Sequence, residues 1–219
     1  MQLIQAILLD PVGSLAEFPA QPFEAIAVHL TGRGLPAGIS GSQAYWDVLD
    51  LLDPRGPLPA QDRAFVESWE MRAVERASLY EDAAPALAEL DALGMTLIVA
   101  SSLSAAAVDG FLTRFSLRDV FANCSSRDSA GGVKRAPLVH ALADRGLAPD
   151  RTMVLADTAA GLQAAKEAGA HAILMMNDPD EAMRLAAHDP AGGIVSLHEL
   201  PDFLRVVRAA KGRLSDRLA

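Results

Sequence analysis

Short apolar segments, each of strand length, alternate with helical patterns along this chain. The segments cover residues 3–9, 96–100, 120–122, 152–156, 172–176 and 194–195. A strand buried on both faces of a parallel sheet reads as a continuous apolar run, whereas a half-exposed strand alternates polar and apolar residues. The series therefore predicts an α/β fold, a doubly wound parallel sheet with helices on both faces.

Helical patterns fill the intervals between these segments. We predict helices over residues 84–93, 105–115, 137–145 and 162–168. Three of them are followed directly by a glycine, Gly94, Gly146 or Gly169. Glycine readily adopts the left-handed conformation that ends many helices, so these positions support the predicted boundaries.

Residues 16–82 break the alternation, because they are helical in pattern and offer no convincing strand. We expect them to form an inserted helical cap domain, while residues 1–15 and 83–219 form the α/β core domain. Tyr45, Trp46 and Trp69 lie in the insertion at helical spacing. We expect these aromatic side chains to pack its interior, because large aromatic surfaces mostly contribute to packing.

The formal net charge of -9 would repel nucleic acid and anionic lipid, so neither is an expected partner. No apolar run approaches the roughly 20 residues that a membrane-spanning helix needs. Asp10 interrupts the N-terminal apolar stretch before the core of a signal peptide could form. The single cysteine, Cys124, cannot form an internal disulfide, and we expect it to be a buried small hydrophobe. These features indicate a cytoplasmic protein and leave the oligomeric state open.

Polar side chains follow the predicted strands at several points. In chain order they are Asp10, Ser101 with Ser102, Lys134 on a loop, and Asp157. Ligands of an open parallel sheet bind beyond the carboxyl ends of the strands, near the point where the strand order reverses. An acidic protein can still bind a small-molecule anionic substrate if a metal ion or one lysine reverses the sign of the charge locally.

These segments resemble, in the same order, the four motifs of the haloacid dehalogenase superfamily. They read DPVGSL at residues 10–15, VASS at 99–102, VKRAP at 133–137 and VLADTAAG at 154–161. The family's motifs are an Asp-x-Asp-Gly-Thr-Leu type loop, a serine or threonine after a strand, a lysine, and an acidic segment. The resemblance spans nearly the whole chain, and it implies a Rossmann-like core with a helical cap.

The resemblance also implies a phosphatase-like hydrolase and assigns roles to individual residues. Asp10 would be the nucleophile that attacks phosphorus and forms an aspartyl-phosphate. Lys134 would neutralise the carboxylates and hold a substrate oxygen, and the Ser101 hydroxyl would donate a hydrogen bond to the transferred group. Ser102 and a cap arginine, Arg55, are the expected substrate-binding residues.

Mg²⁺ is the cofactor that the resemblance implies, since this hard cation takes oxygen ligands. By position, its protein ligands would be the side chains of Asp10 and Asp157 and the main-chain carbonyl of Val12. Ala156 and Gly161 stand where relatives hold a further acidic group, so we expect weak binding of the metal.

Val12 stands where the family's phosphatases carry a second aspartate, which protonates the leaving group and later activates water. Loss of such a positioned acid and base typically costs about 10²- to 10⁴-fold in rate. We therefore expect weak or atypical hydrolysis of a small phosphorylated metabolite. The alternative is a catalytically retired protein of this fold that binds a ligand or a partner.

A third possibility is a hydrolase similar to the 2-haloacid dehalogenases. That branch needs no metal, but it carries a tyrosine at the position of Val12 and a cap arginine that cradles the halide. Arg33, Arg55 and Arg63 are the arginines of the predicted cap that would suit this role.

Overall fold

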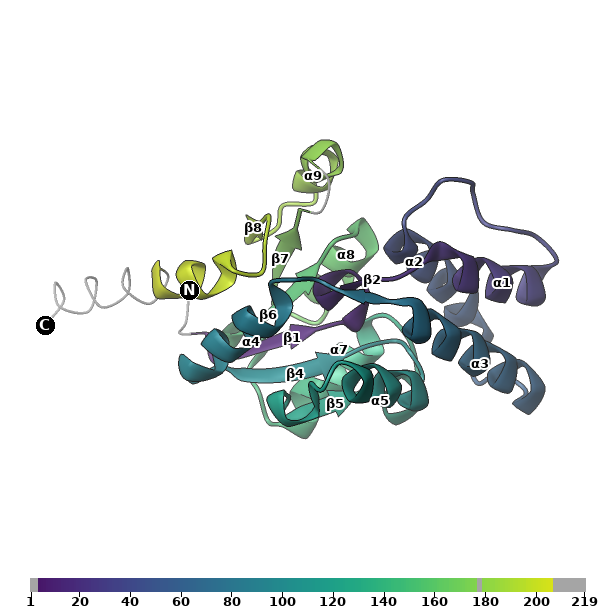
Figure 1. The fold of residues 1–219 in the computed structure, drawn as a ribbon, viewed down its shortest axis with the longest axis horizontal. Coiled ribbons are helices and arrows are strands. Elements are labelled where there is room, and N and C mark those ends of the chain that lie inside the picture. The colour runs from purple at the N-terminus through teal and green to yellow at the C-terminus, as the bar shows by residue number, and fades with distance from the viewer. Residues whose placement is uncertain (1–3, 177–178, 207–219) are drawn as a thin grey trace, which may run out of the picture.

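The structure of the chain, a computed structural model, describes residues 4–176 and 179–206 (Figure 1). Its main feature is a parallel sheet of six strands in the order β5-β4-β1-β6-β7-β8. The strands are β1 (Ala6–Leu9), β4 (Thr96–Ala100), β5 (Asn123–Ser125), β6 (Thr152–Ala156), β7 (His171–Met175) and β8 (Gly192–Ile194). The chain builds outward from β1 to β4 and β5, and then continues on the other side with β6. The strand order therefore reverses at β1.

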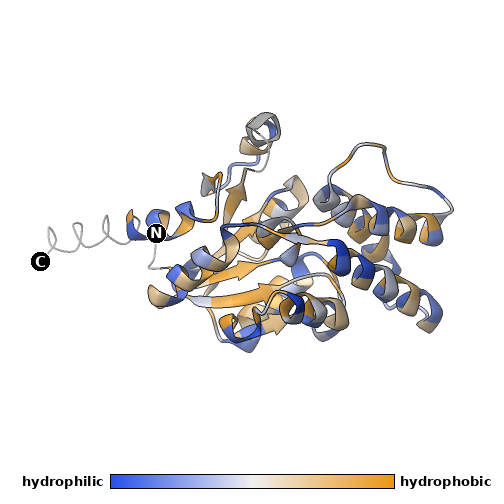
Figure 2. Ribbon diagram, viewed as in Figure 1, coloured by the Kyte–Doolittle hydropathy of each residue, from blue (hydrophilic) through white to orange (hydrophobic). Residues whose placement is uncertain are grey.

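Each face of the sheet belongs to its own apolar core, because successive side chains of a strand point to opposite faces. On β1, Ile7 and Leu9 enter one core and Leu8 enters the other. The first core also contains side chains of α4 (Ala83–Ala92) and α5 (Ala105–Arg114), and the second contains side chains of α7 (Arg135–Asp144) and α8 (Ala159–Glu167). Figure 2 shows apolar strands between helices that turn polar faces outward. The doubly wound α/β fold predicted from the sequence is confirmed.

Side-chain caps fix the first turns of two helices that follow strand ends. The Ser104 hydroxyl accepts a hydrogen bond from the Ala107 amide at 3.2 Å and begins α5. The Thr158 hydroxyl accepts one from the Gly161 amide at 3.2 Å and begins α8. Such caps satisfy amides that have no partner within the helix. The loops after β4 and β6 are thereby held in place.

Between β1 and β4 the chain forms a helical insertion, residues 20–76, at one end of the sheet (Figure 1). It consists of α1 (Ala20–Thr31), α2 (Gly41–Leu52), the short helix η2 (Asp53–Arg55) and α3 (Ala60–Arg76). Two antiparallel strands, β2 (Ala16–Glu17) and β3 (Ser78–Leu79), join it to the rest of the chain. Phe18 stacks on Phe111 of α5, with ring centroids 5.8 Å apart. The insertion thus shares the first apolar core with one face of the sheet.

Two strand predictions were wrong. Residues 120–122 are not a strand, because residues 118–120 form a 3-10 turn and the strand begins at Asn123. β5 lies at the edge of the sheet, where polar residues are common and an apolar pattern gives little guidance. The expectation that residues 16–82 contain no strand was also wrong: β2 and β3 lie there, and they are too short to produce a pattern.

Other local features differ from the predictions as well. Cys124 is exposed rather than buried, because it lies on the edge strand β5. The short helix α6 (Arg127–Ala130) and the helix α9 (Pro179–Ala186) were not predicted from the sequence. A single turn such as α6 is too short to show helical periodicity.

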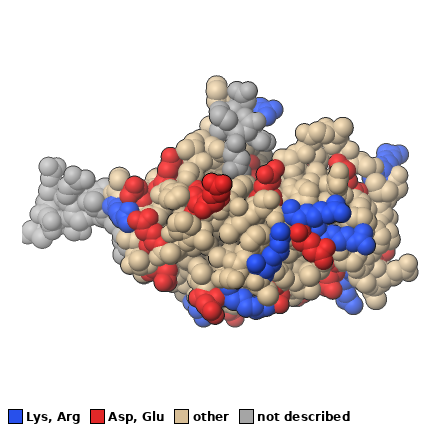
Figure 3. Space-filling view, viewed as in Figure 1, with Lys and Arg blue, Asp and Glu red and all other residues tan. Residues whose placement is uncertain are grey.

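Both charge signs occur on the surface. On the face in Figure 3, basic side chains gather on the α3 side, with acidic ones among them, and further acidic side chains are spread over the α/β half. Within residues 4–176 and 179–206, none of the helices has the length and apolar content required to span a bilayer.

Candidate active site

Most of the residues predicted to carry chemistry meet at the carboxyl end of β1, where the strand order reverses. A small cavity there is lined by Asp10, Val12, Ser102, Lys134 and Asp157, among others. Its volume is about 30 Å³, whereas small-molecule sites usually measure roughly 300–1,000 Å³. The structure thus brings these side chains together but leaves no room among them for a phosphorylated substrate.

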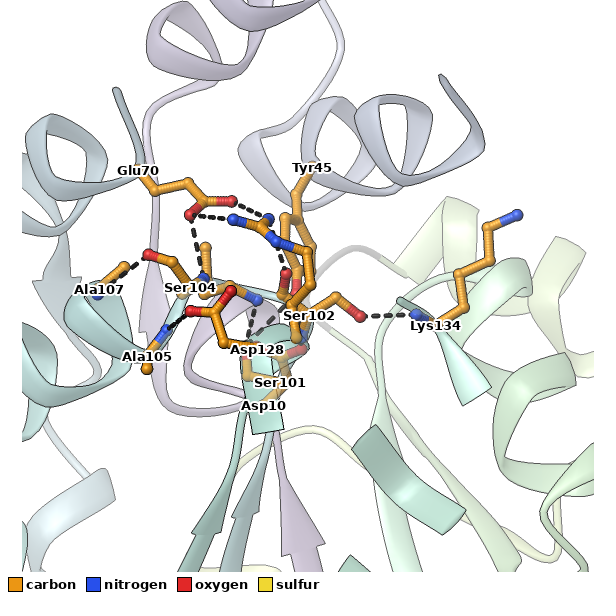
Figure 4. Close-up of polar contacts among 12 residues, drawn as sticks. Asp10, Tyr45, Glu70, Ser101, Ser102, Ser104, Ala105, Ala107, Asp128 and Lys134 are labelled. Carbon is orange, nitrogen blue, oxygen red and sulfur yellow. Dashed lines mark hydrogen bonds and ion pairs between the residues drawn. The ribbon is translucent and has the colours of Figure 1, made fainter. Parts of the chain in front are cut away.

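Both oxygens of the Asp10 carboxylate accept hydrogen bonds (Figure 4). Oδ1 accepts from the Val12 amide at 3.1 Å and from the Ser101 hydroxyl at 2.8 Å. Oδ2 accepts from the Tyr45 hydroxyl at 3.1 Å. Burial raises the pKa of Asp10 from 3.8 to about 7, against the lowering effect of these hydrogen bonds, and the negative charge of Asp157 adds to the rise. Asp10 therefore changes its charge near neutral pH.

The loop after Asp10 depends on a glycine. Gly13 has a φ of 79°, a main-chain conformation that residues other than glycine rarely adopt. A Cβ atom at this position would lie 2.2 Å from Oδ2 of Asp157 and 2.3 Å from Oγ of Ser42. The Ser14 hydroxyl donates to the Leu155 carbonyl of β6 at 3.2 Å and ties the loop to the sheet. Glycine thus allows the main chain to pass directly beside Asp157.

The loop after β4 supplies the two predicted serines, and both are buried. Ser101 contacts Asp10 as described. The Ser102 amide donates to the Tyr45 hydroxyl at 2.8 Å, and the Ser102 hydroxyl accepts from the Lys134 amide at 2.6 Å. Both serine hydroxyls and the Ser102 amide therefore have hydrogen-bond partners within the protein.

Lys134 lines the cavity, but its ammonium group is not directed at Asp10. Nζ lies 2.5 Å from Oδ1 of Asp50 and 3.4 Å from Oδ2 of Asp53, and Figure 4 shows the side chain pointing away from Asp10. Partial burial lowers its pKa, but the hydrogen bond to Asp50 and the charges of both aspartates hold it above the ordinary value. The predicted neutralisation of the carboxylates by Lys134 is absent from this conformation, because two acidic groups at the end of α2 bind the lysine instead.

Arg55 is not at the site, contrary to the sequence prediction. Its Nε donates to the Leu51 carbonyl and its Nη2 donates to the Leu30 carbonyl, each at 2.9 Å. These bonds join the end of α2 to α1 on the exposed side of the insertion. Arg55 therefore stabilises the insertion and does not line the cavity beside Asp10.

The predicted metal ligands lie around one space. Asp10, Val12 and Asp157 all line the 30 Å³ cavity. Across residues 4–176 and 179–206, no group of three or more His, Cys, Asp or Glu side chains is arranged to hold a metal ion. Two carboxylates and a carbonyl are nevertheless the hard oxygen donors that Mg²⁺ takes, usually with several waters. The donor set fits a weakly held Mg²⁺.

Tyr45 is a member of the site that the sequence did not reveal. It packs in the apolar core, as expected, with its ring centroid 5.4 Å from that of Phe23. Its hydroxyl, however, reaches Asp10 and Ser102. The available signal was a phenol on the buried stripe of a helix, since a buried tyrosine hydroxyl usually has a hydrogen-bond partner.

A buried ion pair was missed as well. Arg127 of α6 binds Glu70 of α3 through two contacts of 2.6 and 3.1 Å. Glu70 also accepts from the Ser104 amide at 3.0 Å, and Arg127 donates to the Ser102 carbonyl at 3.1 Å. Together they hold the loop after β4 against the insertion. The signal was Glu70 itself, a charged residue on the buried stripe of α3.

A second cavity, of about 330 Å³, lies between the insertion and the core. Its lining includes apolar side chains such as Leu58 and the charged residues Asp53, Arg63, Arg127 and Asp128. Asp53 also pairs with Lys134, so this cavity borders the residues around Asp10. Its volume falls within the range of roughly 300–1,000 Å³ that is usual for small-molecule sites.

The chain is similar in sequence to known proteins. The family model described as haloacid dehalogenase-like hydrolase matches residues 40–175. The enolase-phosphatase E1 of Gluconacetobacter diazotrophicus is 37% identical over 137 residues, which are 60% of this chain and 57% of that protein. The match thus spans little more than half the length of this relative.

Solved structures show the same fold. A haloacid dehalogenase-like family hydrolase from Streptococcus pneumoniae superposes with a TM-score of 0.67 at 14% identity, covering 93% of this chain and 99% of that one. CbbY from Rhodobacter sphaeroides, in complex with phosphate, superposes with a TM-score of 0.66 at 22% identity, covering 90% and 96%.

Proposed function

We propose that this chain, which belongs to the haloacid dehalogenase-like hydrolase family, hydrolyses a small phosphorylated metabolite with Asp10 as the nucleophile. The observation that carries the proposal is the setting of Asp10. Its carboxylate ends the central strand, and Val12 and Ser101 hold Oδ1, which leaves Oδ2 as the attacking oxygen once Tyr45 moves. The phosphatase name of the 37% identical relative supports the same substrate class.

The proposed reaction has two displacements. Oδ2 of ionised Asp10 forms a bond to phosphorus while the bond from phosphorus to the leaving oxygen breaks, and that oxygen takes a proton from water. Water then attacks the phosphorus of the aspartyl-phosphate, which releases phosphate and restores the carboxylate. The Ser101 hydroxyl and the Ser102 amide are the nearest donors for the phosphoryl oxygens.

Mg²⁺ is the proposed cofactor, held by the carboxylates of Asp10 and Asp157 and by the carbonyl of Val12. When bound, it would neutralise the negative charge that these carboxylates and the phosphate bring together. Asp157 already raises the pKa of Asp10, so a cation between them would favour the ionised nucleophile.

Substrate binding requires a different position of the insertion, because the 30 Å³ cavity does not accept a phosphoryl group. We place the remainder of the substrate in the neighbouring cavity of about 330 Å³. Arg63, on the insertion side of that cavity, replaces Arg55 as the candidate to bind a second anionic group. Lys134 would become available to the phosphate when its pairs with Asp50 and Asp53 open.

Val12 limits the rate in this proposal. Its side chain is buried beside Asp10 and can neither donate nor accept a proton. Turnover should therefore be slower than that of a relative with a positioned acid by about 10²- to 10⁴-fold.

The test is a panel of small phosphate esters assayed with Mg²⁺. Asp10→Asn should abolish turnover, because an amide cannot form the acyl phosphate. Asp91→Asn, the same change at an exposed position on α4, is the matched control and should retain it. Turnover that survives unchanged in Asp10→Asn would contradict the proposal.

The second candidate is a retired enzyme that binds a ligand or a partner. Two observations favour it: Val12 replaces the acid, and the Tyr45 hydroxyl covers Oδ2 of Asp10. Val12→Asp in the same assay separates the candidates. If the natural chain is inactive and Val12→Asp is active, the chain has lost turnover but kept the remaining machinery. Turnover by the natural chain removes this candidate.

A further inference from the structure

The Tyr45 hydroxyl lies among the groups that a transferred phosphoryl group would contact. It is 2.8 Å from the Ser102 amide, 3.1 Å from Oδ2 of Asp10 and 3.3 Å from the Ser101 hydroxyl. The residue is 1% exposed, so the hydroxyl has no access to solvent. These three polar neighbours all belong to the candidate active site.

The hydrogen-bond inventory of a phenol explains this position. Tyr45 has one proton to donate and lone pairs to accept. It accepts from the Ser102 amide, and the Ser101 proton is already given to Oδ1 of Asp10, so its own proton goes to Oδ2. The phenol oxygen thus takes a donor that a phosphoryl oxygen would need. Its proton covers the carboxylate oxygen that would attack.

A phosphoryl group cannot share this position with the phenol. The cavity beside Asp10 measures about 30 Å³, and Trp46, the neighbour of Tyr45 on α2, is part of its lining. The position beside the Ser102 amide and Oδ2 of Asp10 can therefore hold either the phenol of Tyr45 or a bound anion, but not both.

We propose that Tyr45 is an internal competitor for the oxyanion site, and that it sets the affinity and specificity of the site by requiring each anionic ligand to displace it. The inference rests on the proposed function, in that the ligand is the phosphoryl group of the substrate. It adds that only part of the molecules have an open site at any moment, so the apparent affinity for anions is reduced in proportion.

The packing around Tyr45 indicates what displacement involves. Its ring lies against Phe23, and α2 also carries Asp50, which holds Lys134. Moving the phenol out with its helix would separate Asp50 from Lys134 and free the ammonium group near the cavity. A ligand that also fills the neighbouring 330 Å³ cavity would gain binding energy for this movement, whereas inorganic phosphate would not.

The experiment measures binding of inorganic phosphate, and of beryllium fluoride with Mg²⁺, by calorimetry on the whole chain. Tyr45→Phe keeps the ring and removes the competing hydroxyl, so its Kd should fall by about tenfold or more. Tyr80→Phe removes the hydroxyl of the chain's other tyrosine and should leave the Kd unchanged. An affinity of Tyr45→Phe equal to or below that of the natural chain, including no detectable binding by either, would overturn the proposal.

A second measurement needs no variant. Nitration of tyrosines in the natural chain, followed by mass spectrometry, should increase at Tyr45 when saturating phosphate displaces the phenol, with Tyr80 as the internal reference. Unchanged or reduced nitration of Tyr45 would overturn the proposal. Tighter binding by Tyr45→Phe without any turnover would support the competitor and contradict the hydrolase, so the two proposals fail separately.

Discussion

At the scale of single residues, Asp10 is a partly buried carboxylate, and within residues 4–176 and 179–206 no cationic side chain forms an ion pair with it. Lys134, the predicted counter-charge, binds Asp50 and Asp53 instead. Three hydrogen-bond donors stabilise the ionised form, yet burial outweighs them and raises the pKa to about 7. A charge that is removed from water and has no counter-ion is less stable than the neutral form, which raises the pKa of a carboxyl group. A bound cation, or a movement of Lys134 toward Asp10, would therefore stabilise the ionised carboxylate.

The raised pKa predicts a pH dependence of stability in the metal-free protein. The folded state holds the proton of Asp10 more tightly than the unfolded state, so the contribution of Asp10 to stability falls as pH rises from about 4 to about 7 and is then constant. The Asp10→Asn variant lacks this pH-dependent fall in stability, because an amide does not ionise. Its free energy of unfolding relative to the natural chain should rise across that window, by up to about 4 kcal/mol at pH 8.

Urea denaturation in EDTA at several pH values measures this difference, with Asp91→Asn as the control. A difference that does not change between pH 4 and 8 would show that Asp10 has an ordinary pKa.

At the scale of elements, the Glu70–Arg127 pair fixes α3 and α6 to the loop that carries Ser101 and Ser102. Both side chains are largely buried, with 3% and 12% exposed. Removing one partner of such a pair leaves an uncompensated buried charge and costs about 3–5 kcal/mol. The loop after β4 therefore depends on a residue of the insertion for its position.

Glu70→Gln should lower the free energy of unfolding by about 3 kcal/mol, because Arg127 loses its counter-charge. Glu75→Gln, an exposed change on the same helix, should stay within about 0.5 kcal/mol of the natural chain. Thermal and urea unfolding of the two variants measure the effect. Equal stability of both would contradict the structural role of the pair.

Part of the candidate site could be predicted from the sequence through the order of its elements. Asp10, Ser101 and Asp157 follow strands, and parallel strands end at one edge of a sheet, so their meeting place follows from the fold. The direction of the Lys134 side chain does not, because it depends on acidic groups far away in the sequence. Tyr45 was predicted to be buried, but its contact with Asp10 depends on how the insertion docks against the sheet.

At the scale of the whole molecule, the insertion and one face of the sheet form a single apolar core. Two polar connections accompany it, and they differ in burial. Glu70 and Arg127 are enclosed, whereas Asp50 and Asp53 keep more than half of their side-chain surface exposed, at 63% and 55%. Exposed ion pairs contribute little stability, so the connection through Lys134 is the easier one to open. We propose that a substrate enters on this side.

A crystal structure of the protein with Mg²⁺ and beryllium fluoride, a phosphate mimic, tests whether Asp10 accepts a phosphoryl group. We expect beryllium fluoride joined to Oδ2 of Asp10, with the Tyr45 hydroxyl displaced from the Ser102 amide. If, at saturating beryllium fluoride, the carboxylate of Asp10 carries no additional density and keeps its hydrogen bond from Tyr45, Asp10 does not accept a phosphoryl group.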